Sequence, residues 1–265
     1  MVRRPGGVIG VAMVGLLVGV GLIGPTVAPR DPFAIDGPSL ASPSGTYPFG
    51  TDPLGRDVWS GVLHGARTSL LVAVTVALLV LAVGTAVGMA AGYRAGWVDD
   101  ILMRITEFAQ VLPRFFLAIV VIALFGPGLD RLIVVLGLTS WPLLARVVRA
   151  ELLSLREREF VEAARADGAG TMRIVVRELL PNALAPALVV LGLVVAQVLL
   201  IEASLAFLGL GDPNAVSWGY LANQGQRVLR VAWWPAVFPG LAIVIAVLGC
   251  NLVADALNDA LGARR

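Results

Sequence analysis

Residues 162–181 read EAARADGAGTMRIVVRELLP, and this polar stretch lies between two long apolar runs. Small residues in its first third would let another surface approach a helix closely, and Gly168 permits the sharp backbone turn that would end that helix. The residues after the turn would give a second helix one apolar face; they are Ile174, Val175, Val176, Leu179 and Leu180. The stretch predicts two helices joined by a tight turn, although the bare pattern equally fits an amphipathic loop on a membrane surface.

Apolar residues dominate the rest of the chain, because 58% of its 265 residues are hydrophobic and only 14% are charged. A soluble domain carries about 25% charged residues, so this composition indicates a membrane protein. The formal net charge of +2 is too small to indicate a nucleic-acid partner.

Missing residue types exclude several kinds of site. The sequence contains no lysine, so it cannot form the glycine-rich loop with a lysine that holds the phosphates of ATP. Cys250 is the only cysteine and His64 the only histidine, which excludes an internal disulfide and leaves a histidine metal cluster unsupported. No nucleophile, base and orienting group stand together, so we expect no catalytic residue, metal or cofactor in this chain.

Four uncharged stretches reach the length of about 20 residues that a helix needs to cross a bilayer. They are residues 8–28, 68–93, 179–201 and 231–254. Two weaker candidates are residues 104–125, which include Glu107 and Arg114, and residues 132–145, which are flanked by arginines. Together they predict an all-α membrane protein with six transmembrane helices.

The arginines favour one orientation of these six spans. With the N-terminus inside, six arginines fall outside, namely Arg30, Arg56, Arg67, Arg131, Arg227 and Arg230. Thirteen fall inside, namely Arg3, Arg4, Arg94, Arg104, Arg146, Arg149, Arg156, Arg158, Arg165, Arg173, Arg177, Arg264 and Arg265. Because cytoplasmic loops carry an excess of positive charge, we expect both termini and the loop at residues 149–181 to be cytoplasmic.

The chain is expected to have two parts. Residues 1–66 would form a retained N-terminal anchor helix and an external segment. Within that segment, residues 30–65 are rich in Pro, Gly, Ser and Asp, which is typical of a loop, with one short interfacial helix expected near residues 57–63. Residues 67–259 would form the main transmembrane domain.

Ordered blocks from Phe49 to Leu261 resemble the C-type permease subunit of dipeptide and oligopeptide ABC importers. The blocks are residues 49–58, 61–70, 125–128, 158–182, 202–211 and 238–241, followed by Asn251, Leu252, Asp255, Leu257, Asp259 and Ala260. The resemblance implies the type I importer permease fold, with its MetI-like transmembrane domain, in a bacterial cytoplasmic (inner) membrane. It also implies a paired B-type permease, two ATPase subunits that bind ATP and magnesium, and an external substrate-binding protein.

The resemblance also assigns a role to the loop. Glu162, Ala163 and Gly168 occupy the positions that fit the groove of the ATPase, so the whole loop is expected to dock there. The expected docking residues are Glu162, Ala163, Ala164, Arg165, Asp167, Gly168 and Gly170. Glu178 departs from the family pattern, which has isoleucine there, and this puts the packing of the second helix in doubt.

Three ionisable residues fall within expected spans. Arg114 would lie near the middle of the bilayer, where an arginine costs about 2.5–3.5 kcal/mol on insertion scales and needs a partner. Glu107 lies seven residues earlier, on the same face of a continuous helix, and Glu202 lies late in a later span. Each residue either lines the translocation pathway or forms a buried structural contact, and the sequence leaves both readings open.

The substrate also stays open at this point. The family handles dipeptides and longer peptides, and the same machinery imports nickel chelates, haem or glutathione. A secondary transporter driven by ions is the alternative class, and it would need acidic relays or an inverted repeat.

Overall fold

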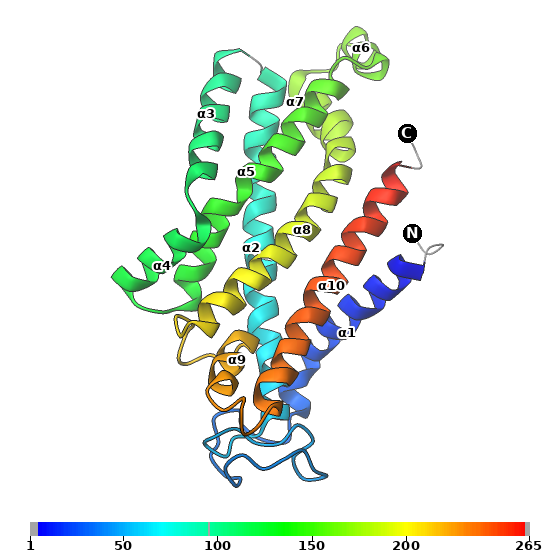
Figure 1. Cartoon of the computed structure of the whole chain (residues 1–265). Helices are drawn as coiled ribbons and strands as arrows, with labels where there is room; N and C mark the ends of the chain where they lie inside the picture. Colours follow the sequence, from blue (N-terminus) through cyan, green and yellow to red (C-terminus); the bar gives the residue numbers. More distant parts are fainter. Residues whose placement is uncertain (1–4, 95, 263–265) are drawn as a thin grey trace.

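The computed structural model describes residues 5–94 and 96–262, and within these ranges the chain is almost entirely helical (Figure 1). Five helices are long and apolar enough to cross a membrane. They are α1 (Pro5–Val27), α2 (Val58–Arg94), α5 (Leu129–Leu155), α8 (Leu180–Phe207) with the turns before it, and α10 (Trp234–Gly262). The shorter helices are α3 (Trp97–Val111), α4 (Arg114–Phe125), α6 (Glu159–Ala166), α7 (Thr171–Arg173) and α9 (Trp218–Gln226), and a π-helical turn spans Ile174–Leu179.

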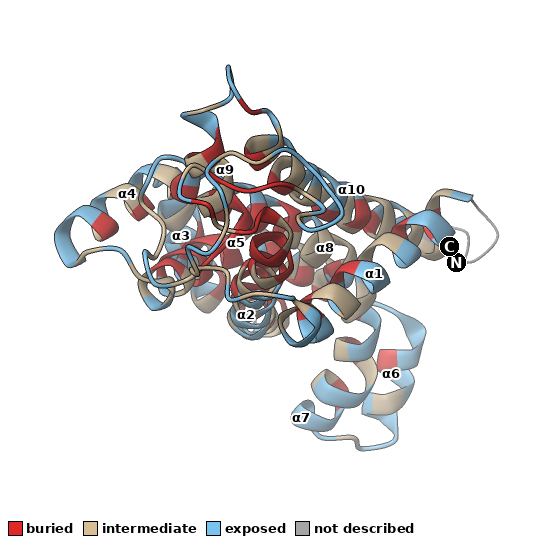
Figure 2. Ribbon diagram, turned by 90° about the horizontal axis from the view of Figure 1, so that it is seen from below, coloured by how far each residue is buried: buried red, intermediate tan, exposed pale blue. Residues whose placement is uncertain are grey.

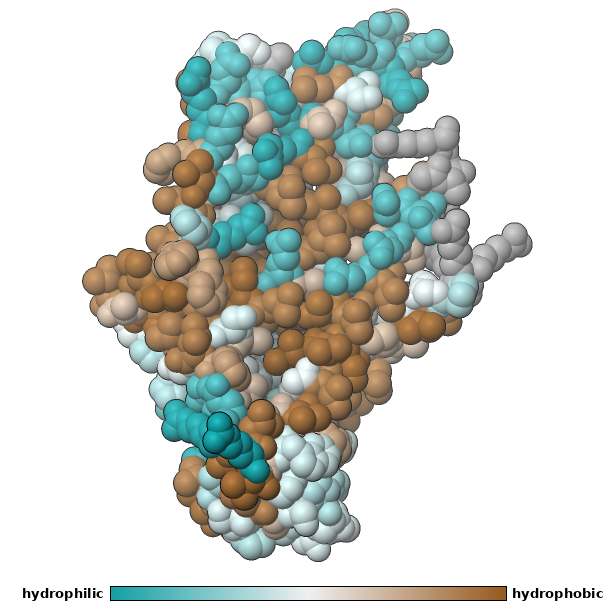
Figure 3. Space-filling view, in the orientation of Figure 1, coloured by the Kyte–Doolittle hydropathy of each residue, from teal (hydrophilic) through white to brown (hydrophobic). Residues whose placement is uncertain are grey.

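The surface shows where the membrane would lie. Hydrophobic residues form a broad band across the middle of the molecule, and more polar residues gather at its two ends (Figure 3). The polar α6 lies at one end, and the loop before α2 lies at the other (Figure 1). The start of α1 and the end of α10 point towards the α6 end, whereas Arg3, Arg4, Arg264 and Arg265 lie outside the described residues.

The expected span at residues 104–125 is not one straight helix. It consists of α3 and α4, which meet at an angle of 73°. Leu112 and Pro113 are extended, with ψ angles of 119° and 107°. Proline disfavours the helical conformation in the residue before it and has no N–H to donate, so the helix ends at Val111 and a new one begins at Arg114.

The centre of the bundle is the parallel pair α2 and α5 (Figure 2). Gly84, Gly88 and Gly92 form a stripe along α2 that faces α5. A methyl group at Gly88 would lie 2.6 Å from the carbonyl oxygen of Ala145 and 2.7 Å from Cβ of Val148. Because glycine has no side chain, the two helices approach more closely than larger residues would allow.

The loop before α2 is compact and packs on the ends of α2 and α10. The Trp234 indole donates to the Thr51 carbonyl at 3.0 Å, and the rings of Phe49 and Phe238 stack at 3.9 Å. The short interfacial helix expected near residues 57–63 is absent as a separate element, because those residues are the start of α2. Asp57 caps α2 by accepting from the backbone N–H of Ser60 at 3.1 Å, and the expected boundary at residues 66–67 falls inside this helix.

Candidate functional site

The loop expected to dock a partner is a short helix and a turn between α5 and α8. Helix α6 follows the end of α5 after three residues. Glu159 and Glu162 lie in its first turn and Arg165 in its last, where each charge is favourable to the helix dipole. The local sequence therefore stabilises a helix of only eight residues at this position.

The turn after α6 has a defined hydrogen-bond pattern. Gly168 has a φ angle of 75°, in the left-handed region that favours glycine. Its N–H donates to the carbonyl of Arg165 at 3.0 Å, and the N–H of Ala169 donates to the carbonyl of Ala164 at 3.0 Å. This pair of bonds is a Schellman motif, so Gly168 ends the helix and reverses the chain as the sequence predicted.

The inner side of the loop is anchored by apolar contacts. Val161 on α6 is fully buried, and Ile174 and Leu179 in the π-helical turn are buried as well. Glu178 is only partly exposed and lies beside this buried pair rather than within it. The departure from the family pattern at Glu178 therefore falls on a partly exposed position of the π-helical turn, between Arg177 and buried Leu179.

The second helix of the loop differs from the expected one, because it runs on through Pro181 without a break. Pro181 lacks the N–H that would normally donate to the fourth residue before it. The preceding turn is widened, and the N–H of Leu180 donates to the carbonyl of Val175, five residues back. The residues from Thr171 to Phe207 form one long apolar segment, so the turn at Gly168 is attached directly to a membrane span.

The outer side of the loop is exposed and combines charged, small and apolar groups (Figure 2). The structure brings the expected residues together there, with Glu162, Ala163, Arg165, Asp167, Gly168 and Gly170 exposed and Ala164 partly buried. Sequence reasoning missed Met172, which is 75% exposed and follows the turn directly. The feature of the sequence that could have pointed to Met172 is a large apolar residue directly after a polar turn.

Arg114 and Glu107 do not form the expected pair, because the break at Pro113 places them on different helices. Glu107 is exposed on α3. Arg114 begins α4, and its guanidinium donates to the side-chain oxygen of Gln197 on α8 at the long distance of 3.5 Å. The assumption of one continuous helical face was wrong.

Glu202 lies where three helices meet. It is buried on α8, and it accepts a hydrogen bond from the Ser69 hydroxyl of α2 at 3.2 Å. It also bonds the side chain of Ser217, the residue that caps α9. The Trp218 indole donates to the Val62 carbonyl at 3.0 Å. These contacts join α8 to α2 and to the start of α9.

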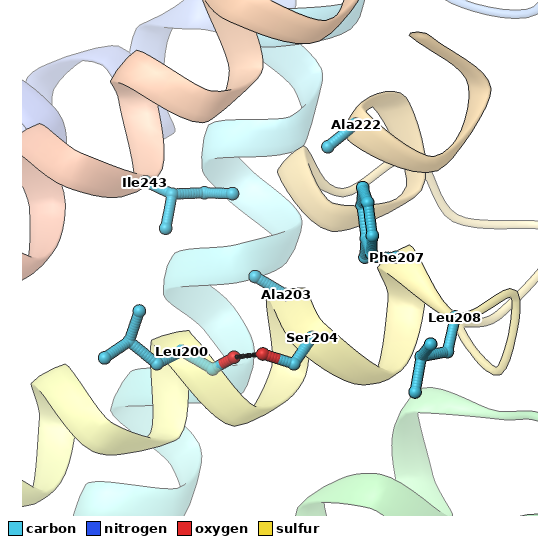
Figure 4. Close-up of a pocket in the computed structure, with 7 residues that line it drawn as sticks. All are labelled: Leu200, Ala203, Ser204, Phe207, Leu208, Ala222 and Ile243. Atoms are coloured by element: carbon cyan, nitrogen blue, oxygen red, sulfur yellow. Dashed lines mark hydrogen bonds between the residues drawn. The ribbon is translucent and has the colours of Figure 1, made fainter. Parts of the chain in front are cut away.

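A hollow of about 360 Å³ lies near Glu202 between α8, α9 and α10. Its lining is almost entirely apolar, and Leu200, Phe207 and Ile243 project towards it (Figure 4). The single lining hydroxyl, that of Ser204, donates to the Leu200 carbonyl of its own helix at 2.6 Å. The hollow therefore presents an apolar surface and no group for chemistry.

Comparison with known proteins identifies the family. Residues 84–265 match the model of the binding-protein-dependent transport system inner membrane component. The chain belongs to this family. It is an ABC importer permease subunit and a multi-pass membrane protein, and its fold is that of the type I importer permeases.

Relatives and a solved structure agree with this membership. The chain is 41% identical over 210 residues to a Brucella suis protein provisionally named a peptide transport system permease, covering 79% of this chain and 71% of that protein. It is 35% identical over 223 residues to the dipeptide transport system permease protein DppC of Alkalihalophilus pseudofirmus, covering 84% and 73%. A chain of the inward-facing MetNI methionine ABC transporter matches with a TM-score of 0.59 at 21% identity, covering 74% of this chain and 96% of that chain.

Proposed function

We propose that this chain carries peptides across the bacterial cytoplasmic membrane and that separate ATPase subunits drive it through α6 and the turn at Gly168. The observation that carries the proposal is the exposed turn, which is anchored by buried Val161 and Ile174 and attached directly to two spans. The names of the Brucella and Alkalihalophilus relatives support a peptide substrate.

The proposed complex contains this chain, a B-type permease, two ATPase subunits that bind ATP and magnesium, and an external substrate-binding protein. The α6 end and both termini are cytoplasmic, and the loop before α2 is external. The excess of arginine at the α6 end supports this orientation.

Transport then follows from the rigid attachment of α6. ATP draws the two ATPases together, and each docked α6 moves with its ATPase. Because α6 lies three residues from α5 and is packed on the start of the α8 span, its movement is passed to both spans and opens the bundle to the other side. The chain itself makes and breaks no covalent bond, and the docking surface consists of the seven loop residues from Glu162 to Gly170 named above.

A Gly168→Val variant tests this proposal. A Cβ atom at this position meets no atom within 4 Å, so the main effect is backbone strain of about 1–3 kcal/mol in the left-handed conformation. Gly209→Val is the matched control, because Gly209 also has a positive φ and open surroundings but lies at the other end of α8. The readout is ATP-driven uptake of a mixture of isotope-labelled dipeptides and tetrapeptides into vesicles containing the whole complex.

We expect Gly168→Val to assemble and to lose uptake, and Gly209→Val to keep uptake in proportion to the complex formed. Normal uptake by Gly168→Val at normal assembly would contradict the role of the turn. Equal loss of uptake in both assembled variants would show that the loss comes from backbone strain next to α8. That result would also contradict the role of the turn.

A further inference from the structure

A salt bridge joins α3, the first half of the broken span, to α5, the helix that precedes α6. The guanidinium of Arg149 on α5 donates from Nε to Oδ1 of Asp99 on α3 and from a terminal nitrogen to Oδ2, both at 2.5 Å. Two parallel bonds between an arginine and a carboxylate fix the orientation of both groups. Asp99 is only 8% exposed, so the pair is shielded from solvent on the carboxylate side.

The position of each residue suits this contact. Asp99 lies in the first turn of α3, where the helix dipole favours a negative charge. Arg149 lies on α5 six residues before its end at Leu155, and α6 begins soon afterwards. The pair is therefore close in space to the segment that links the bundle to the docking turn.

The backbone of Arg149 is also fixed against α2. A methyl group at Gly92 would lie 3.0 Å from the Arg149 carbonyl oxygen and 2.8 Å from Cβ of Leu152. This close approach packs the end of α5 tightly against α2. The Arg149 side chain connects this packed pair to a third helix, α3.

Helix α3 also packs on the end of α2, to which it is joined by a two-residue connection, but few of its side chains are buried. Within Trp97–Val111, only Asp99 and Thr106 are buried, and the Thr106 hydroxyl donates to the Leu102 carbonyl of its own helix. Large apolar side chains such as Phe108 and Val111 are 69% and 77% exposed. The contact between Asp99 and Arg149 is therefore a polar connection that joins the start of α3 to α5.

We propose that Asp99 and Arg149 are positioning residues that make α3, and with it the broken span, move together with the end of α5 when the ATPases close. The inference rests on the proposed function, because it requires α6 to be moved by a docked ATPase. Without the pair, α3 would be held by packing alone, most of it on α2, and would follow the end of α5 less closely.

Distances between spin labels in the assembled complex test this link. In a Cys250→Ser background, labels at Ile101→Cys on α3 and Ser154→Cys on α5 occupy exposed positions. The distance is measured without nucleotide and after trapping with ATP and vanadate. The test variant is Asp99→Asn with Arg149→Gln, which removes both charges and leaves neither one unpaired in the bundle. The control is Asp100→Asn with Arg146→Gln, which changes exposed neighbours on the same helices.

We expect the distance between the labels on α3 and α5 to stay constant on trapping, both in the protein that keeps Asp99 and Arg149 and in the control variant. In the Asp99 and Arg149 variant it should change by about 5 Å, one helical turn, which is the size of a ratchet of one helix past another. A constant distance in that variant would overturn the link, as would an equal change in the control. Failure of the variant to assemble would also overturn it, because the pair would then serve folding alone.

A second pair of labels separates this result from failure of the proposed function. Labels at Ala163→Cys on α6 and Ser42→Cys in the external loop report whether trapping moves α6 at all. If trapping moves α6 but the distance between α3 and α5 stays constant in the Asp99 and Arg149 variant, only the link between α3 and α5 is contradicted. If α6 does not move in the native complex, the proposed function fails first and the link, which depends on it, falls with it.

Discussion

Glu202 shows how a single buried polar residue can hold several elements together. Its carboxyl group is bonded by hydroxyls from α2 and from the cap of α9, and a methyl group at Gly219 on α9 would lie 2.6 Å from the Ala203 carbonyl on α8. A buried polar group that loses its partner costs more than the bond itself contributes. Glu202 is therefore best understood as the residue that fixes α9 against two spans.

Glu202→Ala should accordingly destabilise the protein. The variant leaves the Ser69 and Ser217 hydroxyls without their buried acceptor, at a cost of about 1–3 kcal/mol for a buried unsatisfied group. Ser204→Ala is the control, because that hydroxyl bonds only its own helix. Thermal unfolding of the purified complex in detergent, followed by tryptophan fluorescence, should show a lower midpoint for Glu202→Ala alone. Equal midpoints for the two variants would mean that the buried carboxyl does not stabilise the junction.

Helices α2 and α5 form a central frame against which most of the other helices pack. Their close approach depends on the glycine stripe of α2; α2 begins at the loop that precedes it, and α5 leads to α6 at the opposite end of the molecule (Figure 1). Helices in a membrane associate through such close packing, because lipid provides little hydrophobic driving force between them. A rigid frame lets a movement at one end reach the other.

A methyl group in the stripe should weaken this frame. Gly88→Ala places Cβ 2.6 Å from a carbonyl oxygen of α5, and overpacking of this kind costs about 1–3 kcal/mol. Gly19→Ala on α1 is the control, because nothing lies within 4 Å of its Cβ position. The midpoint of thermal unfolding should fall for Gly88→Ala and stay unchanged for Gly19→Ala. A similar midpoint for both variants would show that the stripe does not set the helix spacing.

The elements also show what the sequence could and could not predict. Four spans and the turn at Gly168 were predictable, because apolar length and a glycine after a short helix are local signals. The break at Pro113 was not, since membrane helices tolerate proline and the local pattern does not separate a kink from a break. The contacts of Glu202 with Ser69 and of Asp99 with Arg149 join residues 133 and 50 positions apart, and only the packed bundle brings them together.

At the scale of the whole molecule, the two ends differ in a way that suits two different tasks. One end is the compact loop before α2, fixed to α2 and α10 by aromatic and backbone contacts. The other end carries α6 and the arginine-rich turn that we propose as the docking site. We propose that this turn meets an ATPase on the cytoplasmic side, so that ATP hydrolysis at that end drives transport through the bundle.

Site-specific photocrosslinking tests that claim most directly. In a Cys250→Ser background, a benzophenone attached to Ala163→Cys lies on the exposed face of α6, and one attached to Ser42→Cys lies in the external loop. On irradiation of membranes that contain the whole complex, the label at position 163 should yield a product of this chain with the ATPase, and the label at position 42 should not. An ATPase product from position 42, or none from position 163 in a complex that hydrolyses ATP, would show that α6 does not meet the ATPase.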